Sequence, residues 1–175
     1  ILIDANTGFV IAENNADEPL PPASLAKMMT TYIAVKQIKQ GTLSDYEEVL
    51  VSDNAWEKGG AKTDGSTMFL SPRTTVPVID LMRGIIIQSG NDAAIALAEH
   101  ISGSEDEFSN LMNDYAVELG MNKTFYYNST GLPAEGMMSS ARDQAKLAKA
   151  IIEIDPDYYA IYSEKYFQHN DINQP

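Results

Sequence analysis

Five segments with apolar residues at helical spacing, each bounded by start or stop signals, set the strongest limit on the fold. Such spacing places the apolar side chains on one face of a helix, and that face must pack against a partner. The sequence therefore predicts a body built mainly of packed helices. The segments run from Leu25 to the stop signal Gly41, from Pro77 over Ile85, from Asp92 to Ile101, from Ser104 to Gly120, and from Ser140 to Asp155.

Strand signals are confined to the two ends of the chain. Residues 1–4 and 9–12 are rich in β-branched and apolar residues, and Asn6-Thr7-Gly8 between them supplies turn residues, which predicts a hairpin. Residues 165–174 have weak strand character. We expect one helical body that is opened by a hairpin and followed by an unfinished β region.

Charge and composition exclude several classes of function. The 175 residues carry 25 Asp and Glu against 12 Lys and Arg, a net charge of −13 that repels nucleic-acid backbones. The absence of cysteine excludes a thiol nucleophile and a Cys-ligated metal, and the two histidines form no metal-ligand pattern. We therefore expect no cofactor, no metal and no nucleic-acid partner.

The first candidate for chemistry is a serine with a lysine three residues later, Ser24 and Lys27, directly after Pro21-Pro22. Residues at this spacing share a helix face, so the lysine amine can reach the serine hydroxyl. A helix N-terminus disfavours a protonated lysine and favours an anion forming at the serine, as in an activated nucleophile. The alternative interpretation is a helix-capping serine beside a surface lysine.

The second candidate is Ser89-Gly90-Asn91, at the junction of two apolar helices. A hydroxyl and an amide on such a tight connection can face a cleft as proton relay and substrate clamp, although a simple helix cap has the same sequence. Neither His100 nor His169 fits a Ser-His-Asp arrangement. A serine enzyme with this sequence would need lysine as its base.

The order of these motifs, Ser-x-x-Lys and then Ser-Gly-Asn, resembles the penicillin-recognising serine enzymes. The likeness is to the low-molecular-mass penicillin-binding proteins of the D-alanyl-D-alanine carboxypeptidase type. It implies an α/β fold of the β-lactamase/transpeptidase type, with a helical body, an N-terminal hairpin and most of the antiparallel sheet outside this sequence. The stretches that carry the likeness are Pro22–Thr30, Asn54–Trp56, Gln88–Ala93, Leu119–Met121 and Ser139–Asp143.

The resemblance implies specific roles for four residues. Ser24 would be the nucleophile, Lys27 the general base, Ser89 the proton relay and Asn91 a substrate-binding residue. The reaction would remove the terminal D-alanine from peptidoglycan pentapeptide stems through an acyl-enzyme on Ser24, and β-lactams would be covalent inhibitors. The alternatives are a D,D-endopeptidase of the same family, a β-lactamase, and a muropeptide-binding module without turnover.

The third motif of the family, Lys-Thr-Gly, is absent from these 175 residues; the nearest string is the interrupted Lys62-Thr63-Asp64-Gly65. We therefore expect residues 1–175 to be a partial catalytic domain that lacks the third motif and the C-terminal β domain, and to be inactive alone. The resemblance also implies an extracytoplasmic, periplasmic protein at the periphery of the inner membrane. Any membrane attachment would come from a C-terminal anchor outside this sequence.

Overall fold

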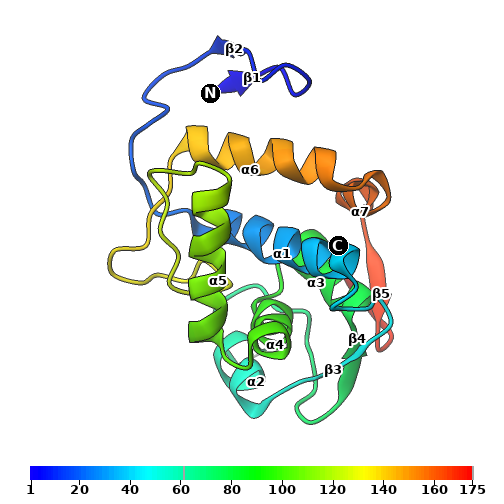
Figure 1. The fold of residues 1–175 in the computed structure, drawn as a ribbon. Coiled ribbons are helices and arrows are strands. Elements are labelled where there is room, and N and C mark those ends of the chain that lie inside the picture. The colour runs from blue at the N-terminus through cyan, green and yellow to red at the C-terminus, as the bar shows by residue number, and fades with distance from the viewer. Residues whose placement is uncertain (61, 175) are drawn as a thin grey trace.

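The computed structural model describes residues 1–60 and 62–174. It shows five long helices, of which four pack around the first, α1 (Figure 1). Helix α1 contacts each of the other four, and this central position buries most of its side chains. All five predicted helical segments are confirmed. Their bounds are α1 Ala26–Gln40, α3 Val78–Gln88, α4 Asn91–Ser102, α5 Glu105–Glu118 and α6 Ala141–Ile154.

Two apolar clusters meet at α1. One lies between α3, α4 and a small strand pair, and the other fills the space between α1, α5 and α6. Helix α4 can approach its neighbours closely because its inward residues include four fully buried alanines. The shorter helical elements are the 3₁₀ turn η1 Ala23–Leu25, α2 Asp53–Gly59, α7 Pro156–Ala160 and the 3₁₀ turn η2 Ile161–Ser163.

The described strands form three separate antiparallel pairs: β1 Leu2–Ile3 with β2 Val10–Ala12, β3 Glu48–Leu50 with β4 Thr75–Pro77, and β5 Phe167–His169 with β6 Ile172–Gln174. The N-terminal hairpin predicted from the sequence is therefore confirmed, and in Figure 1 it lies beyond α6. The weak strand signal near the end of the chain is also confirmed. Asn170 and Asp171 both have positive φ, as a tight hairpin turn requires.

Side-chain caps fix the starts of two helices as their sequences predicted. Ser104 accepts a hydrogen bond from the Glu107 amide at 3.1 Å, and Ser140 accepts one from the Asp143 amide at 3.2 Å. The start of the first helical segment differs from the expectation. Ser24 lies in the 3₁₀ turn η1 and α1 begins only at Ala26, so Leu25 points outward and is 51% exposed.

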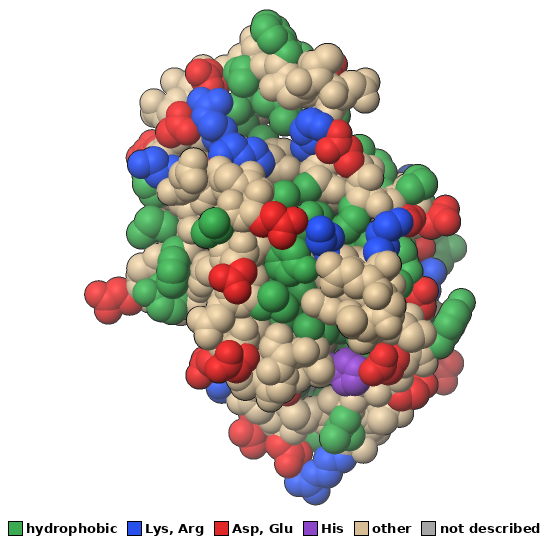
Figure 2. Space-filling view, viewed as in Figure 1, with side chains coloured by type: hydrophobic (Ala, Val, Ile, Leu, Met, Phe, Trp, Pro, Cys, Tyr) green, Lys and Arg blue, Asp and Glu red, His purple; other side chains and the backbone are tan. Residues whose placement is uncertain are grey.

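The charge is dispersed over the surface. Figure 2 shows Asp and Glu side chains spread over the viewed face, with Lys and Arg among them. Several carboxylates are neutralised locally, as in the pairs Lys36–Glu118 and Lys39–Asp155. Within the described residues, no helix has the length and apolar character needed to cross a bilayer.

Candidate active site

Ser24 and Lys27 come together where η1 passes into α1. The Lys27 Nζ lies 3.2 Å from the Ser24 Oγ, so the three-residue spacing produces the contact that the sequence predicted. Ser24 is exposed, whereas Lys27 is only 4% exposed. A lysine this deeply buried is not the surface lysine of the alternative interpretation.

Burial also changes the basicity of Lys27. Removal from water disfavours the ammonium form and lowers the pKa of Lys27 from 10.5 to about 8. The amine donates a second hydrogen bond, 2.9 Å long, to the backbone carbonyl of Thr130. Lys27 is therefore held between the candidate nucleophile and a loop that is distant in the sequence, with a pKa near neutrality.

The loop that supplies this carbonyl, residues 128–137, packs closely against the turn that carries Ser24, called the serine turn below. Asn128 Oδ1 accepts hydrogen bonds from the backbone amides of Thr130 and Gly131 and so closes a turn at residues 128–131. Gly131 has a φ of +82°, and a Cβ at this position would lie 1.8 Å from the Ala23 carbonyl oxygen. Only glycine permits this close approach of the two backbones.

Ser89 and Asn91 approach the same place from the α3–α4 junction. Ser89 has a φ of +59°, and its buried Oγ has no hydrogen-bond partner within the described part of the chain. Together with Ser24, Lys27 and Tyr162 it lines a cavity of about 110 Å³. The structure thus gathers the two candidate motifs around one point.

A larger cavity of about 760 Å³ opens on the other side of Ser24. One wall is the stretch Asp64–Ser66 together with Asn91, which is 4% exposed, and the opposite wall belongs to the 128–137 loop. Such a cavity, with a nucleophile at its edge and few polar groups, has the size of a small-molecule or peptide site. The described residues contain no group of three His, Asp or Glu that could hold a metal.

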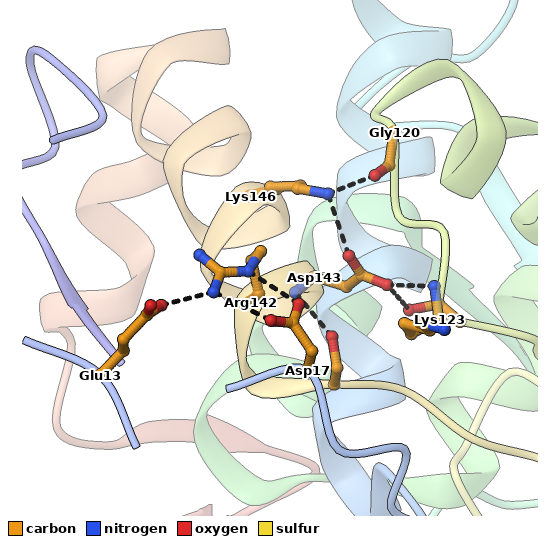
Figure 3. Close-up of polar contacts among 9 residues, drawn as sticks. Glu13, Asp17, Gly120, Lys123, Arg142, Asp143 and Lys146 are labelled. Atoms are coloured by element: carbon orange, nitrogen blue, oxygen red, sulfur yellow. Dashed lines mark hydrogen bonds and ion pairs between the residues drawn. The ribbon is translucent and has the colours of Figure 1, made fainter. Parts of the chain in front are cut away.

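The motif Ser139–Asp143 joins three segments at the start of α6 (Figure 3). Arg142 donates hydrogen bonds to Asp17 and Glu13 of the N-terminal segment. These two carboxylates raise the pKa of the Arg142 guanidinium above its ordinary value. Asp143 is buried, accepts from the Lys123 amide at 2.7 Å and pairs with Lys146 at 3.1 Å. Residues 123–124 precede the 128–137 loop in the chain, so the Ser139–Asp143 motif fixes the segment that leads into this loop.

Two contributions to the site were not predicted from the sequence. The Thr130 carbonyl is a backbone group, and no side-chain pattern marks it as a partner of Lys27. Asp92 is fully buried beside Asn91 and bonds the segment that leads to the cavity wall; its only sequence signal is an acidic residue in a first helical turn. Glu118, at the end of α5, is 58% exposed and pairs with Lys36.

Comparison with known proteins identifies the fold and the family. The family model described as D-alanyl-D-alanine carboxypeptidase, peptidase S11, matches residues 1–175. The chain is 48% identical over 176 residues to D-alanyl-D-alanine carboxypeptidase DacC of Escherichia coli, covering 100% of this chain and 44% of that protein. The chain thus spans less than half the length of this relative.

Comparison with solved structures leads to the same family. Penicillin binding protein 5 from Haemophilus influenzae superposes with a TM-score of 0.94 at 43% identity, over 99% of this chain and 50% of that one. Penicillin-Binding Protein D2 from Listeria monocytogenes, in its ampicillin-bound form, gives a TM-score of 0.83 at 25% identity, over 98% and 68%. The predicted penicillin-binding, transpeptidase-like fold is confirmed, with the helical part and short antiparallel pairs present here. By sequence and by structure, this chain belongs to the D-alanyl-D-alanine carboxypeptidase family.

Proposed function

We propose that the complete gene product is a serine hydrolase that removes the terminal D-alanine from peptidoglycan pentapeptide stems. The observation that carries the proposal is the buried Lys27 amine, held between Ser24 Oγ at 3.2 Å and the Thr130 carbonyl at 2.9 Å. A lysine with its pKa lowered to about 8 is partly neutral at physiological pH and can accept the serine proton. Membership of the family supplies the substrate class.

In the first half of the reaction, Ser24 Oγ attacks the carbonyl carbon of the penultimate D-alanine, and its proton passes to the neutral Lys27 amine. A C–O bond forms and the carbonyl electron pair moves onto oxygen, where the Ser24 backbone N–H is one hydrogen-bond donor. Collapse of this tetrahedral intermediate breaks the C–N bond. The leaving amine takes its proton through Ser89, whose buried Oγ shares a cavity with Lys27.

In the second half, water attacks the ester carbonyl carbon and gives a proton to Lys27. Collapse of this second tetrahedral intermediate breaks the ester C–O bond, and Lys27 returns the proton to the Ser24 oxygen. Asn91 lines the larger cavity beside Ser24, where its amide can bind the peptide backbone of the substrate. A β-lactam that enters this cavity would acylate Ser24 in the same way and remain as a stable ester. Because the substrate is a wall polymer, we place the protein outside the cytoplasm.

Purified complete gene product should release free D-alanine from a pentapeptide, and Ser24→Ala should abolish both this release and the covalent label left by fluorescent penicillin. The matched control is Ser109→Ala, because this serine in α5 donates to the Asp106 carbonyl of its own helical turn at 2.8 Å. A label that survives in Ser24→Ala would overturn the nucleophile assignment.

Other outcomes separate the remaining functions. Cleavage of cross-linked muropeptides without D-alanine release would identify an endopeptidase. Rapid release of hydrolysed penicillin would identify a β-lactamase. Reversible muropeptide binding with neither reaction would identify a binding module.

A further inference from the structure

Asp92, the second residue of α4, is a fully buried carboxylate that the reaction above does not use. Its hydrogen bonds within the described chain all come from neutral donors. The Thr67 hydroxyl donates at 2.7 Å, and backbone amides at Met68, Leu70 and Ala93 donate at 2.8, 2.9 and 2.9 Å. These donors hold both oxygens of the carboxylate, and no cationic side chain is among the partners described for it.

Three of these donors belong to residues 67–70, the segment that contains Phe69, a residue with a strained backbone conformation. Phe69 has a φ of +63°, in the left-handed region that residues with a side chain rarely occupy because of steric strain. The two amides on either side of it, at Met68 and Leu70, bond different oxygens of the Asp92 carboxylate. Asp92 therefore holds residues 67–70 in a tight bend that their own preferences oppose.

The held segment continues directly into the wall of the larger cavity. The Ser66 carbonyl accepts from the Asn91 amide N–H at 2.9 Å, and residues 64–66 line the cavity beside Asn91. Gly65 lies so close that a Cβ there would be 2.4 Å from Asn91 Nδ2. The place of the Asn91 side chain thus depends on the place of this segment.

The nucleophile pair is supported from a different direction. Lys27 is fixed by α1 and by the Thr130 carbonyl, and Thr30 Oγ1 donates to the Ser129 carbonyl at 2.7 Å in the same loop. Within the part of the chain that the structure describes, no side-chain hydrogen bond of Ser24 or Lys27 involves residues 64–70. A shift of the 64–70 segment therefore moves Asn91 and the cavity wall, while the hydrogen bonds described for the Ser24–Lys27 pair are kept.

From this division we propose that Asp92 is a positioning residue: through the 64–70 segment, its carboxylate sets where Asn91 and the adjacent cavity wall meet the substrate. The inference rests on the proposed function, because it assigns the substrate to this cavity. Asp92→Asn replaces one acceptor oxygen by an NH₂ group that faces other donors, so at least one bond to the bend is lost.

The test uses the complete gene product and compares Asp92→Asn with Asp53→Asn. Asp53 also stands in a first helical turn, but it is exposed and pairs with Arg73 on the surface. We expect Asp92→Asn to raise KM for D-alanine release and to slow penicillin acylation by about 10-fold or more, the scale of a displaced substrate contact. The pH midpoint of acylation, which reports on Lys27, should not move, and Asp53→Asn should match the wild type.

Two results would overturn the proposal: acylation by Asp92→Asn that matches wild type, or a loss that comes with a shifted pH midpoint. If Asp92→Asn does not fold, Thr67→Val decides, because it leaves the carboxylate in place and removes the hydroxyl that donates to Asp92 and accepts from the Phe69 backbone N–H. It should slow acylation about threefold with an unchanged midpoint, and no change would contradict the proposal. Failure of the proposed function itself is distinct, since the wild type would then neither release D-alanine nor bind penicillin.

Discussion

The two walls of the larger cavity are held by different devices and touch different parts of the site. The 64–70 segment is bonded to the buried Asp92 carboxylate by neutral donors, and it contacts Asn91. The 128–137 loop packs backbone against backbone on the serine turn, and it bonds Lys27 through Thr130. In the proposed function, we therefore expect the first wall to set how substrate binds and the second to position the groups that transfer the proton.

The largest effect on acylation is expected from Gly131→Ala, which places a methyl group where the 128–137 loop contacts the serine turn. A Cβ there meets the Ala23 carbonyl oxygen at 1.8 Å, so one of the two backbones must move. Penicillin acylation should fall at least about 100-fold, because the loop also positions Lys27. The rate of labelling by fluorescent penicillin measures this.

Gly103→Ala is the matched control, because Gly103 has the same φ of +82° with nothing within 4 Å of its Cβ position. It should lose stability through the backbone strain alone and acylate at the wild-type rate. Equal acylation by the two variants would show that the loop does not position the nucleophile pair.

The pH dependence of acylation tests the role of Lys27, which is bonded to the 128–137 wall. Lys27 must be neutral to take the Ser24 proton, and burial lowers its pKa to about 8. Acylation should therefore rise with pH and level off above about pH 8, and below this midpoint it should fall about tenfold for each pH unit. Stopped-flow labelling from pH 6 to 10 measures the profile. A rate independent of pH over this range would exclude Lys27 as the base.

Gly65→Ala tests the other wall and should have a smaller effect than Gly131→Ala. The added Cβ meets Asn91 Nδ2, the end of a side chain that can rotate away, rather than a backbone atom. We expect about a tenfold loss in kcat/KM for D-alanine release, with the pH midpoint of acylation unchanged. A shifted midpoint would show that this wall also acts on Lys27.

The smallest effect is expected from Arg142→Ala, behind the 128–137 loop. Arg142 joins α6 to Glu13 and Asp17 at the surface (Figure 3), and exposed ion pairs of this kind contribute little to stability. Acylation should stay within about twofold of wild type, since Asp143 and Lys146 still hold the start of the loop. A loss as large as that of Gly65→Ala would place Arg142 among the groups that position the site.

The sequence predicted the five long helices, the N-terminal hairpin and weak strand character near the end of the chain, because periodicity, capping and turn residues are local signals. It did not predict α2 or the pair of β3 and β4, and the roles of the four candidate residues stay predictions. It did not reveal how the loops meet the site. The bond from Lys27 to the Thr130 carbonyl joins positions far apart in the chain through a backbone atom that any residue would supply. The role of Asp92 depends on the strained bend at Phe69, which no local pattern encodes.

The account depends most directly on Ser24 as the residue that becomes acylated. The complete gene product should be treated with benzylpenicillin, digested, and analysed by peptide mass spectrometry. We predict one penicilloyl adduct per molecule, on the peptide that contains Ser24 and at that residue, and none in Ser24→Ala. An adduct on another serine, or an unmodified Ser24 in a protein that still releases D-alanine, would contradict the account.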